Sequence, residues 1–490
     1  MAEGGDDLDD LLSAARSARA RRLDDVLGDL AGDATASAPQ VTQEEAKVTE
    51  PDATAGATPA ASIGEDYAVR RARWMRGLSI VLGAVAFAGL LTDAVAASQL
   101  LTDSGPWAFA IVWPLGGLSL LVAAALQARF VDRFARVGVL VTLLAGYSAL
   151  FVVVLALTAL GVPSSWPAAI GWLLADQMNF LVPLVVWSLA SDVFTAGEAV
   201  NLYPQISRWM YVGQFAGLGV AVVGALVWRD AGSDLVWLLA LAPVACLAAA
   251  VLAPRLLRDA MTATGHGREE ATSEAWRSTI EFIRELPSFD WLMRLSFAVM
   301  LAGTVVEFAF FELTGDRIES AGRLQAVYAG ATLGGFVLCW VVQATVASRL
   351  LHRFGVEKVL LALPLATAVA GVVMVLAGSN RSVVLAVVGL LVWRLPRWSI
   401  DGSARQSALA LLPDERRGRS SFAIDLAPIA TALVLSALPI SLMLLTDARW
   451  LLGGLAVVLA GVALVCGTKV VAHWQTTQLN YRLKRRKRLR

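Results

Sequence analysis

Two arginines lie within a run of apolar residues in the C-terminal part of the sequence. The run begins near Val383, and Arg394 and Arg397 follow in the segment VWRLPRWSIDGSARQ of residues 392–406. Residues three apart share one face of a helix, so both guanidinium groups would point the same way. An arginine at the centre of a membrane helix costs at least about 2.5–3.5 kcal/mol on insertion scales. Both side chains therefore need a partner if the run lies inside a membrane.

Three arrangements could satisfy these arginines. An anionic solute could bind them, because a guanidinium presents a fork of donors that matches phosphate or carboxylate oxygens. Alternatively, a buried acid such as Asp176 or Glu307 could form a fixed ion pair with them. In the third arrangement the helix ends early and both side chains reach the membrane surface. Pro396 removes a backbone donor between the two charges and loosens the helix there. We take Arg394 and Arg397 as the candidate anion contacts.

Other ionisable residues lie inside further apolar runs. Asp176, with Gln177 and Asn179 beside it, joins the predicted solute-binding set. Glu307 stands among apolar and aromatic neighbours in VVEFAFFEL, which favours its neutral form, so it could bind and release a proton. Asp93 is a candidate for the same coupling role. A structural role, such as a hydrogen bond to a facing helix, is the alternative for Glu307 and Asp93.

Long apolar helices must position these residues. The 490-residue chain is 57% hydrophobic and 17% charged, whereas a soluble protein is closer to a quarter charged. Apolar runs of roughly 18–24 residues recur, each long enough to cross a bilayer once. We therefore predict an all-α polytopic membrane protein in a lipid bilayer. The twelve predicted spans are residues 78–101, 107–127, 138–160, 166–190, 209–228, 235–253, 292–314, 324–347, 356–377, 382–400, 421–445 and 450–470.

Basic residues are concentrated in every second loop. Arg70 and Arg76 precede the first span, and Arg255 follows the sixth. The C-terminal segment 482–490 reads RLKRRKRLR. Because basic loops stay in the cytoplasm, this pattern predicts that both termini are cytoplasmic. We expect a multi-pass protein of the plasma membrane, of the bacterial inner-membrane type.

The two halves of the chain resemble one another. ARFVDRFARVGVL at residues 128–140, after the second span, aligns without gaps to SRLLHRFGVEKVL at residues 348–360, after the eighth. Two similar six-span halves imply a pseudo-twofold axis along the membrane normal and a binding site between the halves near the midplane. The predicted divisions are an acidic disordered cytoplasmic tail at 1–68 with a candidate amphipathic helix, a six-helix bundle at 69–253, a cytoplasmic linker with an interfacial helix at 254–290, a second six-helix bundle at 291–471 and a basic cytoplasmic tail at 472–490.

The segment after the second span resembles the signature loop of the major facilitator superfamily, Gly-x-Leu-x-Asp-Arg-x-Gly-Arg. Asp132, Arg133 and Arg136 match its charged positions. The resemblance implies twelve spans in two pseudo-symmetric halves, and a cytoplasmic gate formed by these charges. The further members of the predicted cytoplasmic gate are Arg353 in the second copy of the loop, Asp192 and Asp401 at matching places after spans four and ten, and Arg405.

Two passages resemble the ATP/ADP translocase branch of that superfamily, whose members transport nucleotides. They are WSLASDVFTAGEAVNLYPQI at residues 187–206 and SARQSALALLPDERRGRSSFAIDLAPIA at residues 403–430. The resemblance implies exchange or import of nucleotides or related phosphorylated solutes. The predicted spans are nearly free of lysine, so Arg394 and Arg397 would take the phosphate-binding role of that branch's lysines.

The sequence shows no pattern typical of an enzyme. Ser/His/Asp groupings, metal-ligand spacings and a GxxxxGKS phosphate loop do not occur, so we predict no enzymatic activity, no metal and no cofactor. We expect no binding of nucleic acid and a monomeric protein, with the N-terminal tail as a candidate site for a protein partner.

The leading hypothesis is therefore a secondary active transporter that moves an anionic solute by alternating access. Coupling would come from counter-exchange or from a proton on Glu307. One alternative is an exporter of amphipathic compounds, in which the arginines are paired internally. The other is a non-transporting membrane scaffold or sensor that acts through its tails.

Overall fold

The helices of this protein match the predicted spans closely. The computed structural model describes residues 59–131, 135–194, 196–228, 232–260, 281–409, 412, 420, 422–444 and 450–488. Within these residues twelve helical segments are long and apolar enough to cross a membrane. The first, Tyr67–Ser104, starts earlier than predicted, and the last, Trp450–Leu479, ends later. The prediction of a multi-pass all-α membrane protein is confirmed.

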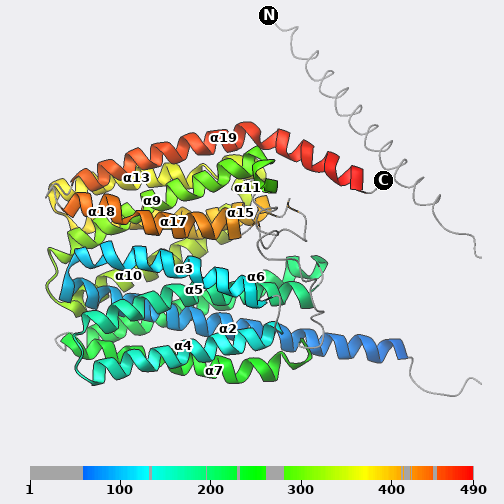
Figure 1. Ribbon diagram of the computed structural model, residues 1–490, viewed down its shortest axis with the longest axis horizontal. Coiled ribbons are helices and arrows are strands. Elements are labelled where there is room, and N and C mark those ends of the chain that lie inside the picture. Colours follow the sequence, from blue (N-terminus) through cyan, green and yellow to red (C-terminus); the bar gives the residue numbers. More distant parts are fainter. Residues whose placement is uncertain are drawn as a thin grey trace, which may run out of the picture. The chain divides into compact units, whose positions relative to one another are not determined.

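Two sets of helices make up the bundle. In Figure 1, α2–α7 are gathered on one side and α13, α17 and α19 on the other. The first set is α2 (Pro59–Ser104), η1 (Pro106–Ala108), α3 (Phe109–Val131), α4 (Arg136–Ala159), α5 (Ser165–Val193), α6 (Ala196–Val227), η2 (Gly232–Ala240), α7 (Leu241–Leu256) and η3 (Arg258–Ala260). The second set is α9 (Pro287–Gly315), α10 (Ala321–Val342), η4 (Gln343–Ala347), α11 (Ser348–Phe354), α12 (Val356–Val359), α13 (Ala362–Asn380), α14 (Val383–Pro396), η5 (Arg397–Asp401), α15 (Gly402–Leu409), η6 (Phe422–Leu426), α17 (Ala427–Leu435), α18 (Ala437–Leu444) and α19 (Trp450–Arg488).

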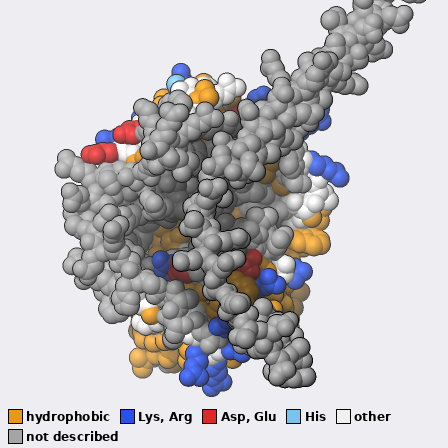
Figure 2. All heavy atoms as spheres, turned by 90° about the vertical axis from the view of Figure 1, so that its right-hand side faces the viewer, with side chains coloured by type: hydrophobic (Ala, Val, Ile, Leu, Met, Phe, Trp, Pro, Cys, Tyr) orange, Lys and Arg blue, Asp and Glu red, His pale blue; other side chains and the backbone are white. Residues whose placement is uncertain are grey.

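The helical bundle has two ends, which differ in composition. The terminal end is the one at which α2 begins and α19 ends, and the far end is the one at which α2 ends and α3 begins. Figure 2 looks at the terminal end and shows Lys and Arg side chains around its rim. Arg70, Arg73 and Arg76 at the start of α2 are exposed there. These arginines, which are among the basic residues used to predict the orientation, thus lie at this end.

Local chemistry explains where the helix that carries the two arginines begins and ends. The Ser382 side chain accepts a hydrogen bond from the Leu385 backbone N–H at 3.3 Å and so caps the start of α14. Arg381 adopts the left-handed conformation, with a φ of 50°, in the turn that precedes this cap. Pro396 closes α14, and the chain continues as the π-helical turn η5. The predicted loosening of the helix at Pro396 therefore takes the form of a wider helical turn.

Close helix packing joins the two sets of helices. Gly117 of α3 lies so close to α17 that an added Cβ would overlap the Ala430 carbonyl oxygen and lie 2.9 Å from both the Leu433 Cβ and the Val434 nitrogen. α6 and α10 also pack against each other across the same boundary. Small residues allow such close approach in membranes, where packing rather than water drives helix association.

A glycine-to-alanine change tests the α3–α17 crossing. Gly117→Ala should lower the free energy of unfolding by about 1–3 kcal/mol, because the added methyl group forces the two helices apart. Gly146→Ala in α4 is the matched control, since nothing lies within 4 Å of its added Cβ. The control should gain up to about 1 kcal/mol from helix propensity. Thermal unfolding in detergent measures both, and equal stability of the two variants would contradict this packing.

Candidate functional site

Arg394 forms a buried ion pair with Glu307. Its Nε lies 2.9 Å and its Nη2 2.7 Å from the Glu307 Oε1, so α14 is tied to α9 in the interior of the bundle. The Arg394 side chain is only 6% exposed, and that of Glu307 is 20% exposed. Arg394 therefore does not reach the membrane surface. Of the three arrangements considered from the sequence, this arginine adopts the internal ion pair.

α10 supplies the other partners of Arg394. Its Nη1 donates to the Thr332 Oγ1 at 2.9 Å, and its Nη2 also donates to the Tyr328 hydroxyl at 3.1 Å. The guanidinium carbon lies 5.0 Å from the centre of the Trp398 ring and 5.2 Å from that of Tyr328. Cation–π contacts of this kind are strongest when the cation is desolvated. Every nitrogen of this guanidinium thus has a protein acceptor.

Asp93 connects this network to the first set of helices. The Tyr328 hydroxyl donates to the Asp93 Oδ2 at 2.8 Å, so α10 is bonded to α2. Two more polar contacts follow along α10. The Ser98 hydroxyl donates to the Gln325 Oε1 at 3.4 Å, and the Gln325 Nε2 donates to the Ala221 carbonyl of α6 at 2.8 Å. Both predicted coupling residues, Glu307 and Asp93, are therefore members of one hydrogen-bonded network.

The three predicted solute-binding residues of α5 have different surroundings. The Gln177 Nε2 donates to the Gly116 carbonyl at 3.1 Å and to the Ser119 hydroxyl at 2.9 Å, which joins α5 to α3. Asn179 packs against Gly89 of α2. Asp176 has no hydrogen bond or ion pair within the described part of the chain. It is half-buried and lies in the electrostatic field of Asp93 and Glu307. Within the described residues, Asp176 and Asn179 have no hydrogen bond, and Asp176 is the one of the three that carries a charge.

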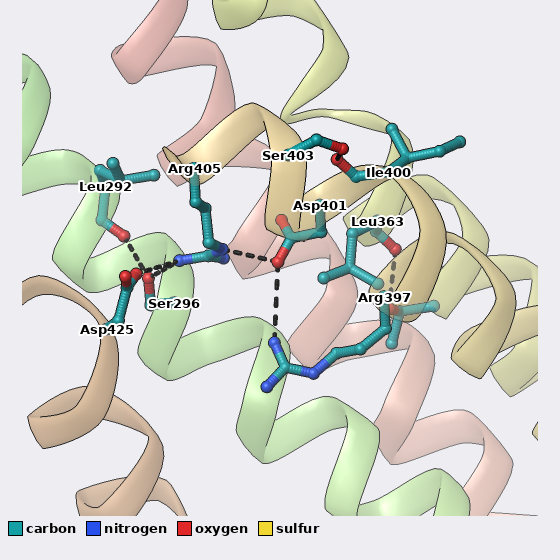
Figure 3. Close-up of polar contacts among 10 residues, drawn as sticks. Leu292, Ser296, Leu363, Arg397, Ile400, Asp401, Ser403, Arg405 and Asp425 are labelled. Atoms are coloured by element: carbon teal, nitrogen blue, oxygen red, sulfur yellow. Dashed lines mark hydrogen bonds and ion pairs between the residues drawn. The ribbon is translucent and has the colours of Figure 1, made fainter. Parts of the chain in front are cut away.

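Arg397 belongs to a second, separate cluster (Figure 3). Its Nη1 lies 3.6 Å from the Asp401 Oδ2, which also accepts from the Arg405 Nε at 2.6 Å. Arg405 extends between Asp401 and two further partners, Ser296 of α9 and Asp425 of η6. Its Nη1 donates to both, and the Asp425 Oδ1 is 3.5 Å away. Two acids and two arginines thus meet where two π-helical turns approach each other.

The two arginines differ in how well their donors are satisfied. Arg394 has four hydrogen bonds, whereas Arg397 makes none within the described residues and has only its 3.6 Å ion pair with Asp401. The Arg397 side chain is 18% exposed, three times the 6% of Arg394. A guanidinium carries five N–H donors, so most of those on Arg397 have no acceptor among the residues that the structure describes. This arginine is the one that can accept an added anion without first losing a hydrogen bond.

The tryptophans near this network serve as packing elements. The Trp398 ring stacks on Phe336 with ring centres 4.3 Å apart and planes 3° apart. Trp393 is buried against Gly303 of α9. These contacts, with the Arg394 guanidinium over Trp398, hold the arginine in place and exclude water from it.

The predicted gate residues are only partly described. Arg136 at the start of α4 pairs with Asp192 near the end of α5, and it also donates to the Ser188 carbonyl at 3.0 Å. Burial raises the pKa of Asp192, and the neighbouring Arg136 opposes that change. Arg353 is exposed and lies over the Phe354 ring at 5.5 Å. Asp132 and Arg133 lie outside the described residues. Asp401 and Arg405, two predicted gate residues, pair with each other, and their further partners are Arg397 and Asp425.

Sequence reasoning missed several members of this site. Tyr328 and Thr332 were not predicted as partners of Arg394, although Gln325, Tyr328 and Thr332 recur at spacings of three and four and so share one face of α10. Arg397, Asp401 and Arg405 are each four residues from the next. This spacing also indicates contacts among them, and it was not used in the sequence analysis. Residues four apart on a helix are neighbours, so a row of ion pairs along this helix could have been predicted.

The fold of this chain is similar to that of known membrane transporters, although its sequence is not. At the level of sequence, no protein-family model and no curated protein match this chain. Solved structures do match. A bacterial homologue of the iron transporter ferroportin in its inward-facing state has a TM-score of 0.56 and 16% identity, over 82% of this chain and 98% of that one. The nucleoside transporter NupG has a TM-score of 0.53 and 12% identity, over 82% and 99%. The POT family transporter PepTSo has a TM-score of 0.59 and 11% identity, over 83% and 98%.

These similarities confirm the predicted fold class. The chain has the major facilitator fold, with twelve membrane-spanning helices in two pseudo-symmetric six-helix halves. In this fold the Arg394 network spans both halves, because Asp93 lies in α2 of the first half and Tyr328, Glu307 and Arg394 lie in the second.

A double-mutant cycle tests the buried ion pair. Arg394→Met and Glu307→Met should each cost about 3–5 kcal/mol in the free energy of unfolding, because each leaves one uncompensated charge in an apolar interior. The double variant should be more stable than either single one, since it buries no unpaired charge. Unfolding in detergent measures all four proteins.

The pair Asp290 and Arg294 is the control for this cycle. Its atoms are 2.8 Å apart, and the Arg294 side chain is 54% exposed, so removal of the Arg294 charge should cost only up to about 1 kcal/mol. Purely additive losses at Arg394 and Glu307 would mean that the two residues are not energetically coupled.

Proposed function

We propose that this protein is a secondary active transporter that moves a small anionic solute by alternating access. The major facilitator fold supports this proposal, as do the ion-pair networks in its apolar interior. Charged groups inside a membrane domain are costly and usually mark a solute or ion pathway. The similar folds include transporters named for iron, nucleosides and D-xylose with protons, so the fold itself is compatible with many solutes.

The Arg397 guanidinium is the proposed anion contact, and its unsatisfied donors are the observation that carries the proposal. The oxygens of a phosphate or carboxylate group could accept from two of its N–H groups in a fork. The 3.6 Å contact with Asp401 does not occupy these donors in that way. Arg394 could contribute only if the solute displaced Glu307 from it. The sequence resemblance to nucleotide transporters and the NupG fold together make a phosphorylated or nucleoside-like solute the first class to test.

Asp176 indicates a second chemical group that the proposed solute would have. Its carboxylate has no protein partner in the described residues, and a bare carboxylate inside a membrane favours a hydrogen-bond donor or a positive group opposite it. A solute with an anionic group for Arg397 and hydroxyl or amino groups for Asp176 would satisfy both side chains.

The proposed coupling step is protonation of Glu307. A proton on this carboxyl removes the charge that holds Arg394, so proton binding and the position of Arg394 are linked. Asp93 can take the same role one hydrogen bond further along the network, through Tyr328. The transporter would lie in the plasma membrane with its basic terminal end in the cytoplasm.

A second candidate function keeps the fold and gives the arginines a structural role. Both Arg394 and Arg397 have an internal acid, which favours an exporter of amphipathic compounds whose charges are fixed within the protein. In that case removal of the Arg397 charge would leave transport unchanged.

A ligand screen tests the anion contact. Nucleotides, sugar phosphates and organic acids are added to the purified protein, and the anion that raises its melting temperature most is taken further. Arg397→Gln should weaken binding of that anion about 10- to 100-fold, since it removes a charge-assisted hydrogen-bond pair. Arg353→Gln is the matched control, because this arginine is exposed and should leave binding unchanged. Equal binding by the parent and Arg397→Gln would favour the exporter.

Transport in proteoliposomes tests the coupling step. With a pH gradient across the membrane, the parent should accumulate the selected anion above its equilibrium level. Glu307→Gln should still exchange internal for external anion but lose accumulation, because it can no longer carry a proton between the two sides. Undiminished gradient-driven accumulation by Glu307→Gln would exclude this residue as the proton carrier.

A further inference from the structure

A cluster of aromatic rings lies at the far end of the bundle and draws on both halves. All of its rings are buried. The far-end aromatic cluster consists of Phe109, Trp113 and Trp172 from the first half and Phe308, Phe310 and Phe311 from the second.

The rings of the two halves interlock. Phe109 stacks on Phe311 with ring centres 4.4 Å apart and planes only 8° apart. Trp172 meets the edges of both, with centres 5.5 Å from Phe109 and 6.3 Å from Phe311. Trp113 approaches Phe308 at 6.4 Å in an edge-to-face arrangement. Such pairs stabilise a contact beyond the area that they bury.

The same end is also closed outside the aromatic rings. An added Cβ at Gly315, the last residue of α9, would lie 3.0 Å from Leu101 near the end of α2. α2 and α9 belong to different halves, so their far ends are in contact. Any path through the bundle to this side must separate these helices and these rings.

Tyr328 connects the cluster to the charged network. Its ring centre lies 5.3 Å from that of Phe311 and 6.1 Å from that of Phe310. Its hydroxyl accepts from Arg394 and donates to Asp93, so one oxygen carries bonds to both halves. One side chain therefore touches both the rings that close the far end and the groups that would bind solute or proton.

We propose that the far-end aromatic cluster is the gate on this side of the transporter and that Tyr328 is the positioning residue that couples the gate to the charged site. While Arg394 is held by Glu307, the hydroxyl of Tyr328 bridges Arg394 and Asp93, and its ring supports Phe311 in the closed cluster. When a proton on Glu307 changes the position of Arg394, the hydroxyl of Tyr328 loses its donor and the ring loses its support. This inference rests on the proposed function, because a gate has a role only in a protein that changes its open side.

Cross-linking at the far end tests the proposal. The three native cysteines are replaced, and the pair Leu101→Cys and Gly315→Cys is treated with a short bis-methanethiosulfonate, which joins the two thiols through reducible disulfide bonds. We expect efficient cross-linking in the parent background, loss of solute exchange in the cross-linked protein and its return on reduction. Tyr328→Phe should shift the balance toward the open gate and lower the cross-linking rate about fivefold, which is the effect of one lost hydrogen bond on a two-state equilibrium.

Two controls separate positioning from simple destabilisation. Tyr147→Phe removes the hydroxyl of a buried tyrosine in the other packing cluster of the first half and should leave cross-linking unchanged. Glu307→Gln should alter the cross-linking rate when Tyr328 is present and have no further effect when it is combined with Tyr328→Phe. A residue with a merely structural role would give independent, additive effects in this pair.

Unchanged cross-linking in Tyr328→Phe, or failure of the parent pair to cross-link, would overturn the proposal. Cross-linking is read from the protein alone, so it is independent of any transported solute. If no anion is transported but the rate still depends on Tyr328 and Glu307, the proposed substrate is wrong and the coupling stands. If transport depends on Arg397 but the cross-linking rate does not change in Tyr328→Phe, the proposed substrate stands and the coupling through Tyr328 is wrong.

Discussion

The ion pair between Arg394 and Glu307 determines which polar side chains are needed in the interior of this protein. Neither charge can leave the apolar interior, so each must be matched within the bundle, and the match draws in Thr332, Tyr328 and, through Tyr328, Asp93. Removal of one member from such a network is costly, and a proton on Glu307 likewise leaves the Arg394 guanidinium without its counter-charge, so protonation favours a new position for that arginine. A network of this kind holds a structure together and can also be switched.

The turn at Pro396 gives the second arginine a different role. α14 ends there and a π-helical turn follows, so Arg397 turns to Asp401 and the cluster shared with Arg405 and Asp425. A regular helix would have kept Arg394 and Arg397 on one face with common partners. Because the wider turn separates them, one guanidinium is saturated and the other is left with spare donors. The different surroundings of the two arginines thus begin at the turn that follows Pro396.

Much of the fold could be predicted from the sequence, because the length of an apolar run indicates whether it can span a membrane. The span boundaries agree to within a few residues at most ends, and Glu307 was correctly considered as an internal partner for an arginine. The pairing itself was not predictable, since it depends on which helices touch. Gln325, Tyr328 and Thr332 looked like ordinary polar residues of a packing helix, and the π-helical turn that redirects Arg397 has no clear sequence signature beyond the proline. The same limit applies to Gln177, whose amide joins α5 to α3, and to Asn179, which packs against α2.

The central claim is that an anion binds at Arg397 while Arg394 stays on Glu307, within a bundle closed at its far end. An experimental structure of the protein with the most stabilising anion from the ligand screen would test this most directly. The account predicts density for the anion against the Arg397 guanidinium, with the Arg394–Glu307 contact kept near its present 2.7 Å. Density at Arg394 with Glu307 displaced, or an anion bound outside the space between the two halves, would contradict it.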